Sequence, residues 1–143
     1  MSLTTIFDIA GSALTAETAR LTASTSNMSN ANVETGNLNE VYKVQYPIFK
    51  TVQENANQWM GDQVKAGVQL KGNYVSNAEP IKHYQPNNPI ADKNGYVYSP
   101  NVNYVEEMAN IISASKSYQM NIELINDAKM LIQRTLQSLQ LGE

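Results

Sequence analysis

The chain has 143 residues, of which 16% are charged, and its formal net charge at pH 7 is −3. This length predicts a single folding unit, and the charge balance argues against a nucleic-acid binder, which needs clustered positive charge. The chain has no cysteine and a single histidine, His83, so disulfides, thiolate catalysis and Cys- or His-pair metal sites within one chain are excluded. We therefore expect no cofactor and no nucleic-acid partner.

Two kinds of membrane-directed segment are not expected. No apolar run approaches the length of about 18 residues that a transmembrane helix needs, so we expect no membrane span. The first residues lack the basic start and the continuous apolar stretch of a secretory signal peptide, so we expect no cleavable signal.

The first expected element is a helix from about Thr4 to Ala31, a stretch that is rich in Ala, Ser and Thr and contains no proline. Serine and threonine make such a helix weak in isolation, so it needs a partner. Its large apolar residues recur every seven positions, which is typical of coiled-coil packing; they are Phe7, Leu14, Leu21 and Met28.

The middle of the chain is expected to form strands and turns. Residues 36–100 hold all five prolines, and proline commonly marks turns and loops. We expect strands over Val41 to Phe49 and Gly67 to Val75, and a turn at Asn94-Gly95 that leads into a further strand. The run from Pro80 to Pro89 is expected to be an extended loop.

A long C-terminal helix is predicted from about Asn103 to Leu139, because this stretch contains neither proline nor glycine. Asn103 can cap its start, and Glu106 lies in capping-box position. Apolar residues again recur every seven positions, at Tyr104, Ile111, Tyr118, Ile125, Ile132 and Leu139. The companion position four residues on carries the apolar residues Met108, Ile122 and Leu136, alternating with the polar Ser115 and Lys129.

The same helix is expected to contact more than one neighbour. Ile112, Met120 and Leu124 lie off the two heptad positions, and a helix that is apolar on more than one side needs more than one partner. One N-terminal helix cannot surround it, so we infer that neighbouring subunits cover the rest. The terminal helices are therefore expected to be assembly surfaces.

Catalytic chemistry is not favoured by the residues available. His83 lies in a proline-rich segment beside Lys82, and nothing in the pattern points to the carboxylate and nucleophile that a general base needs. Glu106 and Glu107 are adjacent in the predicted helix, so their side chains point to different faces and do not form an acid–base pair. We therefore expect a protein that is not an enzyme.

Two motifs resemble those of the bacterial flagellar rod and hook proteins. Asn27-Met28-Ser29-Asn30-Ala31-Asn32, followed by Thr35-Gly36, is similar to the Asn-rich motif that ends the N-terminal helix in that family. The stretch from Pro100 to Gln119 is similar to a rod-protein signature. The motif residues that carry the resemblance are Asn27, Asn30, Asn32, Gly36, Asn101, Asn103, Glu106, Glu107 and Gln119.

The resemblance implies an α+β fold. In that family the N- and C-terminal helices pair antiparallel as a coiled coil, and a small β-rich segment lies between them in sequence. Residues 1–35 would then form the N-terminal helix and the Asn-rich motif. Residues 36–100 would form the β-rich middle segment with its loops, and residues 101–143 the C-terminal coiled-coil helix.

The function implied by the resemblance is that of a structural subunit of the flagellar basal-body rod, the axial drive shaft that transmits motor torque. The implied partners are other copies of the chain, other flagellar rod proteins and the flagellar type III export apparatus, and the implied location is the periplasmic rod. The residues expected at the assembly interface are Phe7, Leu14, Leu21, Met28, Tyr104, Met108, Ile111, Tyr118, Ile122, Ile125, Ile132, Leu136 and Leu139.

The Asn-rich motif carries a hypothesis of its own. Asparagine and serine side chains commonly bond backbone groups that a helix end leaves open. We therefore expect the side chains around Asn27–Asn32 to satisfy backbone groups at the end of the first helix, or to bond across subunits.

A soluble adaptor whose coiled coil binds a partner helix is the alternative function. It would use the same apolar heptads as a rod subunit. The two functions differ in the assembly they predict, because an adaptor forms a fixed small oligomer and never a filament.

Overall fold

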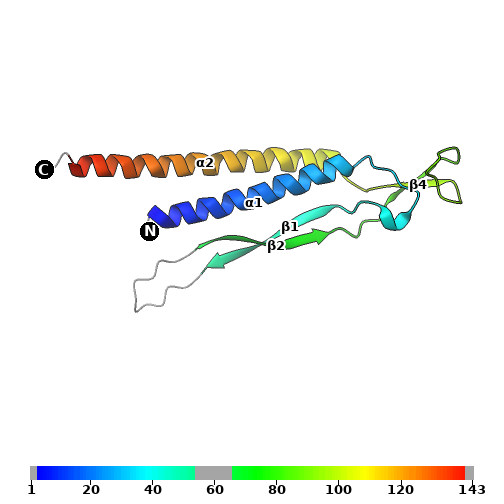
Figure 1. The fold of residues 1–143 in the computed structure, drawn as a ribbon, viewed down its shortest axis with the longest axis horizontal. Coiled ribbons are helices and arrows are strands. Elements are labelled where there is room, and N and C mark those ends of the chain that lie inside the picture. Colours follow the sequence, from blue (N-terminus) through cyan, green and yellow to red (C-terminus); the bar gives the residue numbers. More distant parts are fainter. Residues whose placement is uncertain (1–2, 54–65, 141–143) are drawn as a thin grey trace. The chain divides into compact units, whose positions relative to one another are not determined.

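The structure, a computed structural model, describes residues 3–53 and 66–140 (Figure 1). Two long helices flank a middle segment of strands in the sequence, which confirms the α+β class. The elements in chain order are α1 (Leu3–Asn30), the short 3-10 helix η1 (Leu38–Glu40), β1 (Gln45–Gln53), β2 (Ala66–Val75), β3 (Ile81–Tyr84), β4 (Tyr96–Ser99) and α2 (Tyr104–Gln140).

Helix α1 begins and ends one residue before the helix that the sequence predicts. Serine and threonine are poor helix formers because their hydroxyls compete for backbone groups. In α1 the hydroxyls of Ser12, Thr15 and Thr18 donate to carbonyl oxygens three or four residues earlier. These hydroxyls are therefore satisfied without a break in the helix.

Helix α2 begins at Tyr104, directly after Asn103. The backbone N–H of Glu106 donates to Asn103 Oδ1 at 3.3 Å, which is the capping contact that the sequence predicted. Glu106 and Glu107 lie in the first turn, where the helix dipole favours negative charge. Within the described residues, no helix is long and apolar enough to cross a membrane.

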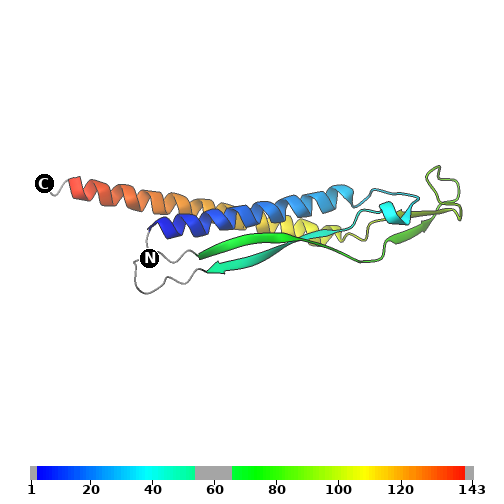
Figure 2. The same cartoon turned by 60° about the horizontal axis from the view of Figure 1, so that its bottom comes forward.

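The described part of the middle segment contains two two-stranded sheets, one of β1 with β2 and one of β3 with β4. Strands β1 and β2 run in opposite directions in both views (Figure 1; Figure 2). In a two-stranded sheet each strand is an edge, which explains how Pro47 is tolerated within β1.

The prediction of an extended loop from Pro80 to Pro89 was wrong for the first part of that run, because Ile81–Tyr84 form strand β3. Strand β3 pairs antiparallel with β4, so that Ile81 faces Ser99 and Tyr84 faces Tyr96. The rings of Tyr84 and Tyr96 lie 5.3 Å apart between centroids, a spacing at which aromatic pairs attract. The pairing depends on a strand beyond an intervening loop, which the local sequence does not reveal.

The turn predicted at Asn94-Gly95 is confirmed. Gly95 has a φ of 79°, in the left-handed region that glycine enters without steric cost. Asp92 organises this turn, because its Oδ1 accepts from the backbone N–H groups of Asn94 and Tyr96, each at 2.8 Å. Its Oδ2 accepts from the hydroxyl of Tyr98 at 3.0 Å.

This turn predicts an acid dependence. The backbone N–H of Tyr96 is the largest cause that holds the pKa of Asp92 below its ordinary value of 3.8. A lowered folded-state pKa means that the charged carboxylate stabilises the hairpin above the unfolded pKa, and that this stabilisation is lost as the pH falls through the folded pKa. We expect the NMR shift of the Val97 amide to change below about pH 4 in the wild-type chain and to change less in Asp92→Asn. An identical acid transition in both chains would contradict the assignment.

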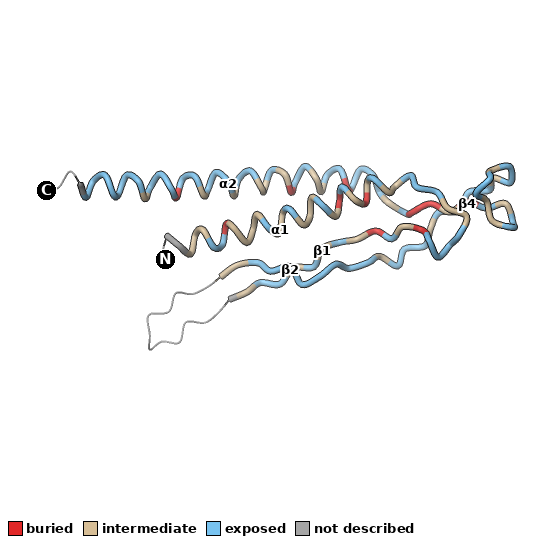
Figure 3. The backbone as a smooth tube through the Cα atoms, viewed as in Figure 1, coloured by how far each residue is buried: buried red, intermediate tan, exposed pale blue. Residues whose placement is uncertain are grey.

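The chain divides into two compact units, which are described separately. One unit takes Met1–Ala19, Phe49–Lys71 and Ala114–Glu143, and the other takes Arg20–Ile48 and Gly72–Ser113. Figure 3 marks where the buried residues lie along the chain. Among the described residues, the buried apolar side chains are those of alanine and valine. They are Ala10, Ala114 and Ala128 in the first unit and Val41, Val44 and Val97 in the second.

A close approach between α1 and β2 lies within the first unit. The backbone N–H of Val68 donates to Ser12 Oγ at 3.1 Å. A Cβ at position 67 would lie 2.9 Å from that same oxygen, which is closer than real Cβ contacts come. Gly67 is therefore the residue that lets the strand approach the helix.

Candidate functional site

The second unit contains a buried pair of polar side chains, Asn27 of α1 and Glu107 of α2. Their exposed fractions are 1% and 2%. Asn27 Nδ2 donates to Glu107 Oε1 at 2.8 Å, across 80 residues of sequence. Buried polar groups are costly unless they are paired, so this contact links the two helices by a bond that both groups need.

Asn27 also binds the start of β1. Its Nδ2 donates to the backbone carbonyl of Gln45 at 3.0 Å, and its Oδ1 accepts from the Gln45 backbone N–H at 3.0 Å. The hydroxyl of Tyr42 donates to the same Oδ1 at 2.8 Å. Both donors and both acceptor positions of the amide are thus occupied, and the side chain pairs with Gln45 as a neighbouring strand would.

The network continues along the end of α1. The Tyr42 hydroxyl has one proton, which it gives to Asn27, so Ser26 Oγ is the donor in its 3.1 Å contact with Tyr42. Asn30 Nδ2 donates to the Ser26 carbonyl oxygen at 2.9 Å. Within this chain, Asn30 therefore bonds a backbone group in the last turn of α1, whereas Asn27 bonds the backbone of β1 and not the helix end that the hypothesis named.

The carboxylate of Glu107 adds negative charge to this buried site. Its Oε2 is buried and has no hydrogen-bond partner among the described residues. Burial raises the pKa of Tyr46, and the charges of Glu107 and Glu106 raise it further. The first turn of α2 supplies the favourable dipole for this charge, and Asn27 supplies the hydrogen bond.

The other motif residues have local roles or are exposed. A Cβ on Gly36 would overlap the Ile90 carbonyl oxygen, so only glycine fits at that position. Next to it, Thr35 and Tyr98 exchange two backbone hydrogen bonds of 2.9 and 2.8 Å. Asn103 and Glu106 form the cap of α2. The exposed members are Asn32, Asn101, Asn103, Glu106 and Gln119.

The structure divides the residues predicted at the assembly interface into two groups. The half-buried ones are Phe7, Leu14, Leu21, Met28, Ile111, Tyr118, Ile125 and Ile132. The exposed ones are Tyr104, Met108, Ile122, Leu136 and Leu139. The large apolar residues of both heptads therefore do not occupy the most buried positions of either helix.

Sequence reasoning missed the positions that α2 buries. These are Glu107, Ala114 and Ala128, which share one heptad position because they are spaced by 7 and 14 residues. Tyr42 and Gln45 were missed as well, because no sequence pattern indicates which residues form hydrogen bonds with Asn27. The spacing of Ala114 and Ala128 was a signal that could have been found, because alanine at a seam permits close helix approach.

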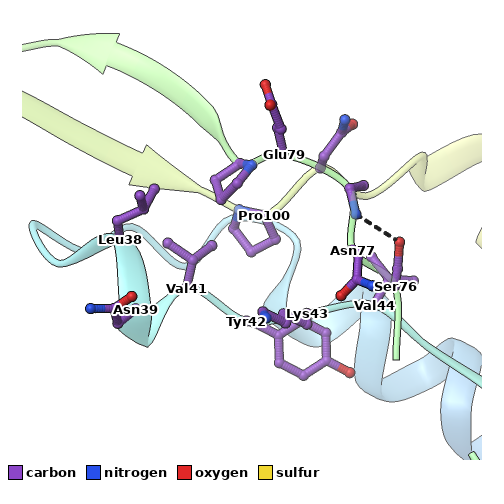
Figure 4. A pocket seen from close by; sticks show the side chains of 13 residues that line it. Leu38, Asn39, Val41, Tyr42, Lys43, Val44, Ser76, Asn77, Glu79 and Pro100 are labelled. Carbon is purple, nitrogen blue, oxygen red and sulfur yellow. Dashed lines mark hydrogen bonds between the residues drawn. The ribbon is translucent and has the colours of Figure 1, made fainter. Parts of the chain in front are cut away.

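The second unit also has an open pocket of about 250 Å³ (Figure 4). Its apolar wall includes Leu38, Val41 and Pro100, and its polar rim includes Asn39 and Asn77. Among the described residues that line it, Glu79 has the one carboxyl group.

Comparison with known proteins identifies the family. The family described as "Flagellar basal body rod FlgEFG protein C-terminal" matches residues 93–138. The flagellar basal-body rod protein FlgC of Salmonella typhimurium is 42% identical over 136 residues, which cover 95% of this chain and 97% of that protein. FlgC of Yersinia enterocolitica is 43% identical over 136 residues, which again cover 95% of this chain and 97% of that protein. FlgC of Buchnera aphidicola subsp. Acyrthosiphon pisum is 38% identical over 140 residues, with the same coverage of this chain and of that protein. The chain therefore belongs to the FlgC family of flagellar basal-body rod proteins.

Proposed function

We propose that the chain is a structural, non-enzymatic subunit of the flagellar basal-body rod that assembles through its terminal helices. The observation that carries this proposal is the similarity to rod proteins along 95% of the chain. The proposed partners are other copies of the chain and other flagellar rod proteins. In the rod the subunit would help to transmit motor torque.

The surface of α2 supports assembly through that helix. Val105, Met120 and Leu131 are 75%, 66% and 57% exposed. Fully burying a side chain of this kind contributes roughly 1.5–3 kcal/mol, so several such contacts per subunit add up to a strong association. Exposed apolar groups of this number on one helix are typical of a contact surface.

We further propose that α1 and α2 pair as an antiparallel coiled coil inside the rod. The heptad spacing in both helices supports this pairing, and so does the hydrogen bond between Asn27 and Glu107. The half-buried members, such as Leu14, Leu21 and Ile125, would then flank the seam and become buried against neighbouring subunits. Segments 1–35 and 101–143 would act as the two assembly elements, and segment 36–100 would be the β-rich part between them in sequence.

The proposed route to the rod is the flagellar type III export apparatus, and the proposed location is the periplasm. Support comes from the resemblance of the N-terminal helix and its Asn-rich motif to those of rod proteins. The lack of cysteine fits a chain that is threaded unfolded through a channel and folds without disulfides.

The proposal is tested by complementation. The FlgC-family gene is deleted from a bacterium that normally swims, and this chain is expressed in its place. Swimming zones are then measured in soft agar. We expect restored swimming, together with recovery of the chain in purified basal bodies. A chain that is expressed but absent from basal bodies, and that forms a fixed small oligomer when purified, would contradict the rod function and favour the adaptor.

A further inference from the structure

The beginning of α2 is anchored at one buried residue. Among Tyr104–Ser113, all of which the structure describes, Glu107 alone is buried, and Asn110 and Ile111 are half-buried. The exposed fractions of Val105, Met108 and Ile112 range from 47% to 75%. Apart from the half-buried Ile111, the large apolar side chains of this part of the helix are therefore exposed.

Small side chains occupy the other buried positions of both helices. In α1 these are Ala10 and Ser24, and in α2 they are Ala114 and Ala128. Coiled coils take their register from large side chains that fit into holes, or from a polar pair that fits in one place only. Alanine and serine supply neither shape nor a required partner, so steric fit alone leaves neighbouring registers open.

We propose that the hydrogen bond between Asn27 and Glu107 fixes the register of α2 against α1 within one chain. A slip of α2 by one heptad would bring Ala114 to Asn27 in place of Glu107, because the two share a heptad position. Asn27 Nδ2 would then lose one of its acceptors, and the carboxylate would lose its amide donor. Only the native register satisfies both groups.

The bond selects the register because Asn27 is itself held in place. The backbone N–H of Gln45 donates to Asn27 Oδ1, and the backbone carbonyl of Gln45 accepts from Asn27 Nδ2. The hydroxyl of Tyr42 also donates to Asn27 Oδ1. The amide therefore cannot turn to follow a displaced helix without breaking these bonds. Asn27 and Glu107 are positioning residues in this account.

The test measures the register directly. Because the chain has no cysteine, Thr25→Cys and Ala109→Cys, both at exposed positions in the same unit, give a clean pair of spin-label sites. The distance between the labels is measured by double electron–electron resonance in the full chain, diluted with unlabelled protein. We expect one narrow distance in the otherwise wild-type chain.

Variants at Glu107 separate register from stability. Glu107→Gln keeps an oxygen that accepts from Asn27 Nδ2, so we expect the wild-type distance. Glu107→Leu replaces the acceptor by an apolar side chain of similar size, and we expect a second, longer distance, because a slip of seven residues moves α2 along its axis by about 10 Å at 1.5 Å per residue. Glu106→Leu is the matched control at the neighbouring exposed position, and it should keep one distance.

Four results would overturn the inference. They are a single unshifted distance in Glu107→Leu, a second distance in Glu107→Gln, more than one distance in the wild-type pair, and loss of helical circular dichroism in Glu107→Leu. The last result would mean that Glu107 supports folding as such and not the choice of register.

Discussion

Replacement of Asn27 by Ala is expected to lower the free energy of unfolding of the full chain by about 3 kcal/mol, the upper end of the cost of leaving a buried polar group unsatisfied. The substitution removes four hydrogen bonds at once. It leaves the Glu107 carboxylate buried without its amide donor, and it leaves the backbone of the half-buried Gln45 without its partner. Since small domains are stable by only about 5–15 kcal/mol, the loss is a large fraction of the total.

The measurement is urea unfolding followed by far-ultraviolet circular dichroism, and the chain offers a matched control. Asn32 belongs to the same motif but is exposed, so Asn32→Ala should change stability by no more than about 0.5 kcal/mol. If Asn27→Ala were as mild as Asn32→Ala, the buried network would not be a stabilising feature of the folded chain.

The second large effect is expected on assembly rather than on folding. Met120 and Leu131 are exposed in the single chain, and the proposed rod buries them against neighbouring subunits. Met120→Asp combined with Leu131→Asp removes two apolar contacts of roughly 1.5–3 kcal/mol each and places two charges in an apolar contact. We expect swimming to be abolished in the complemented strain, while the urea midpoint of the purified chain changes little.

The control for added charge is Asn126→Asp combined with Gln133→Asp, two exposed polar positions on the same helix. This variant gains the same negative charge and should still swim. Full motility of the Met120→Asp/Leu131→Asp chain would mean that this face of α2 stays in solvent, and loss of motility in both variants would assign the effect to charge alone.

The helices were predictable because their signals are local. A stretch without proline or glycine set the length of α2, and Asn103 with Glu106 set its start, as the capping bond confirms. Strand β3 was missed because it depends on pairing with β4 across an intervening loop. Local patterns report propensity, whereas pairing is a tertiary property.

Asn27 and Glu107 of the candidate site were singled out from the sequence, but Tyr42, Gln45 and the geometry of the site were not. The resemblance singled out Asn27 and Glu107, yet nothing in the sequence says that two residues 80 positions apart share a hydrogen bond. The positions that α2 buries in the single chain, Glu107, Ala114 and Ala128, were not predicted. Large apolar residues are expected inward in a soluble protein, and under the proposed assembly neighbouring subunits would cover those that α2 leaves exposed.

The most direct test of the account is electron cryomicroscopy of basal bodies purified from the complemented strain. The rod-subunit account predicts that the chain is found in the rod, and that Met120 and Leu131 lie buried against neighbouring subunits. Rods that contain the chain with both side chains in solvent would contradict assembly through α2. Rods complete without the chain would contradict the function itself.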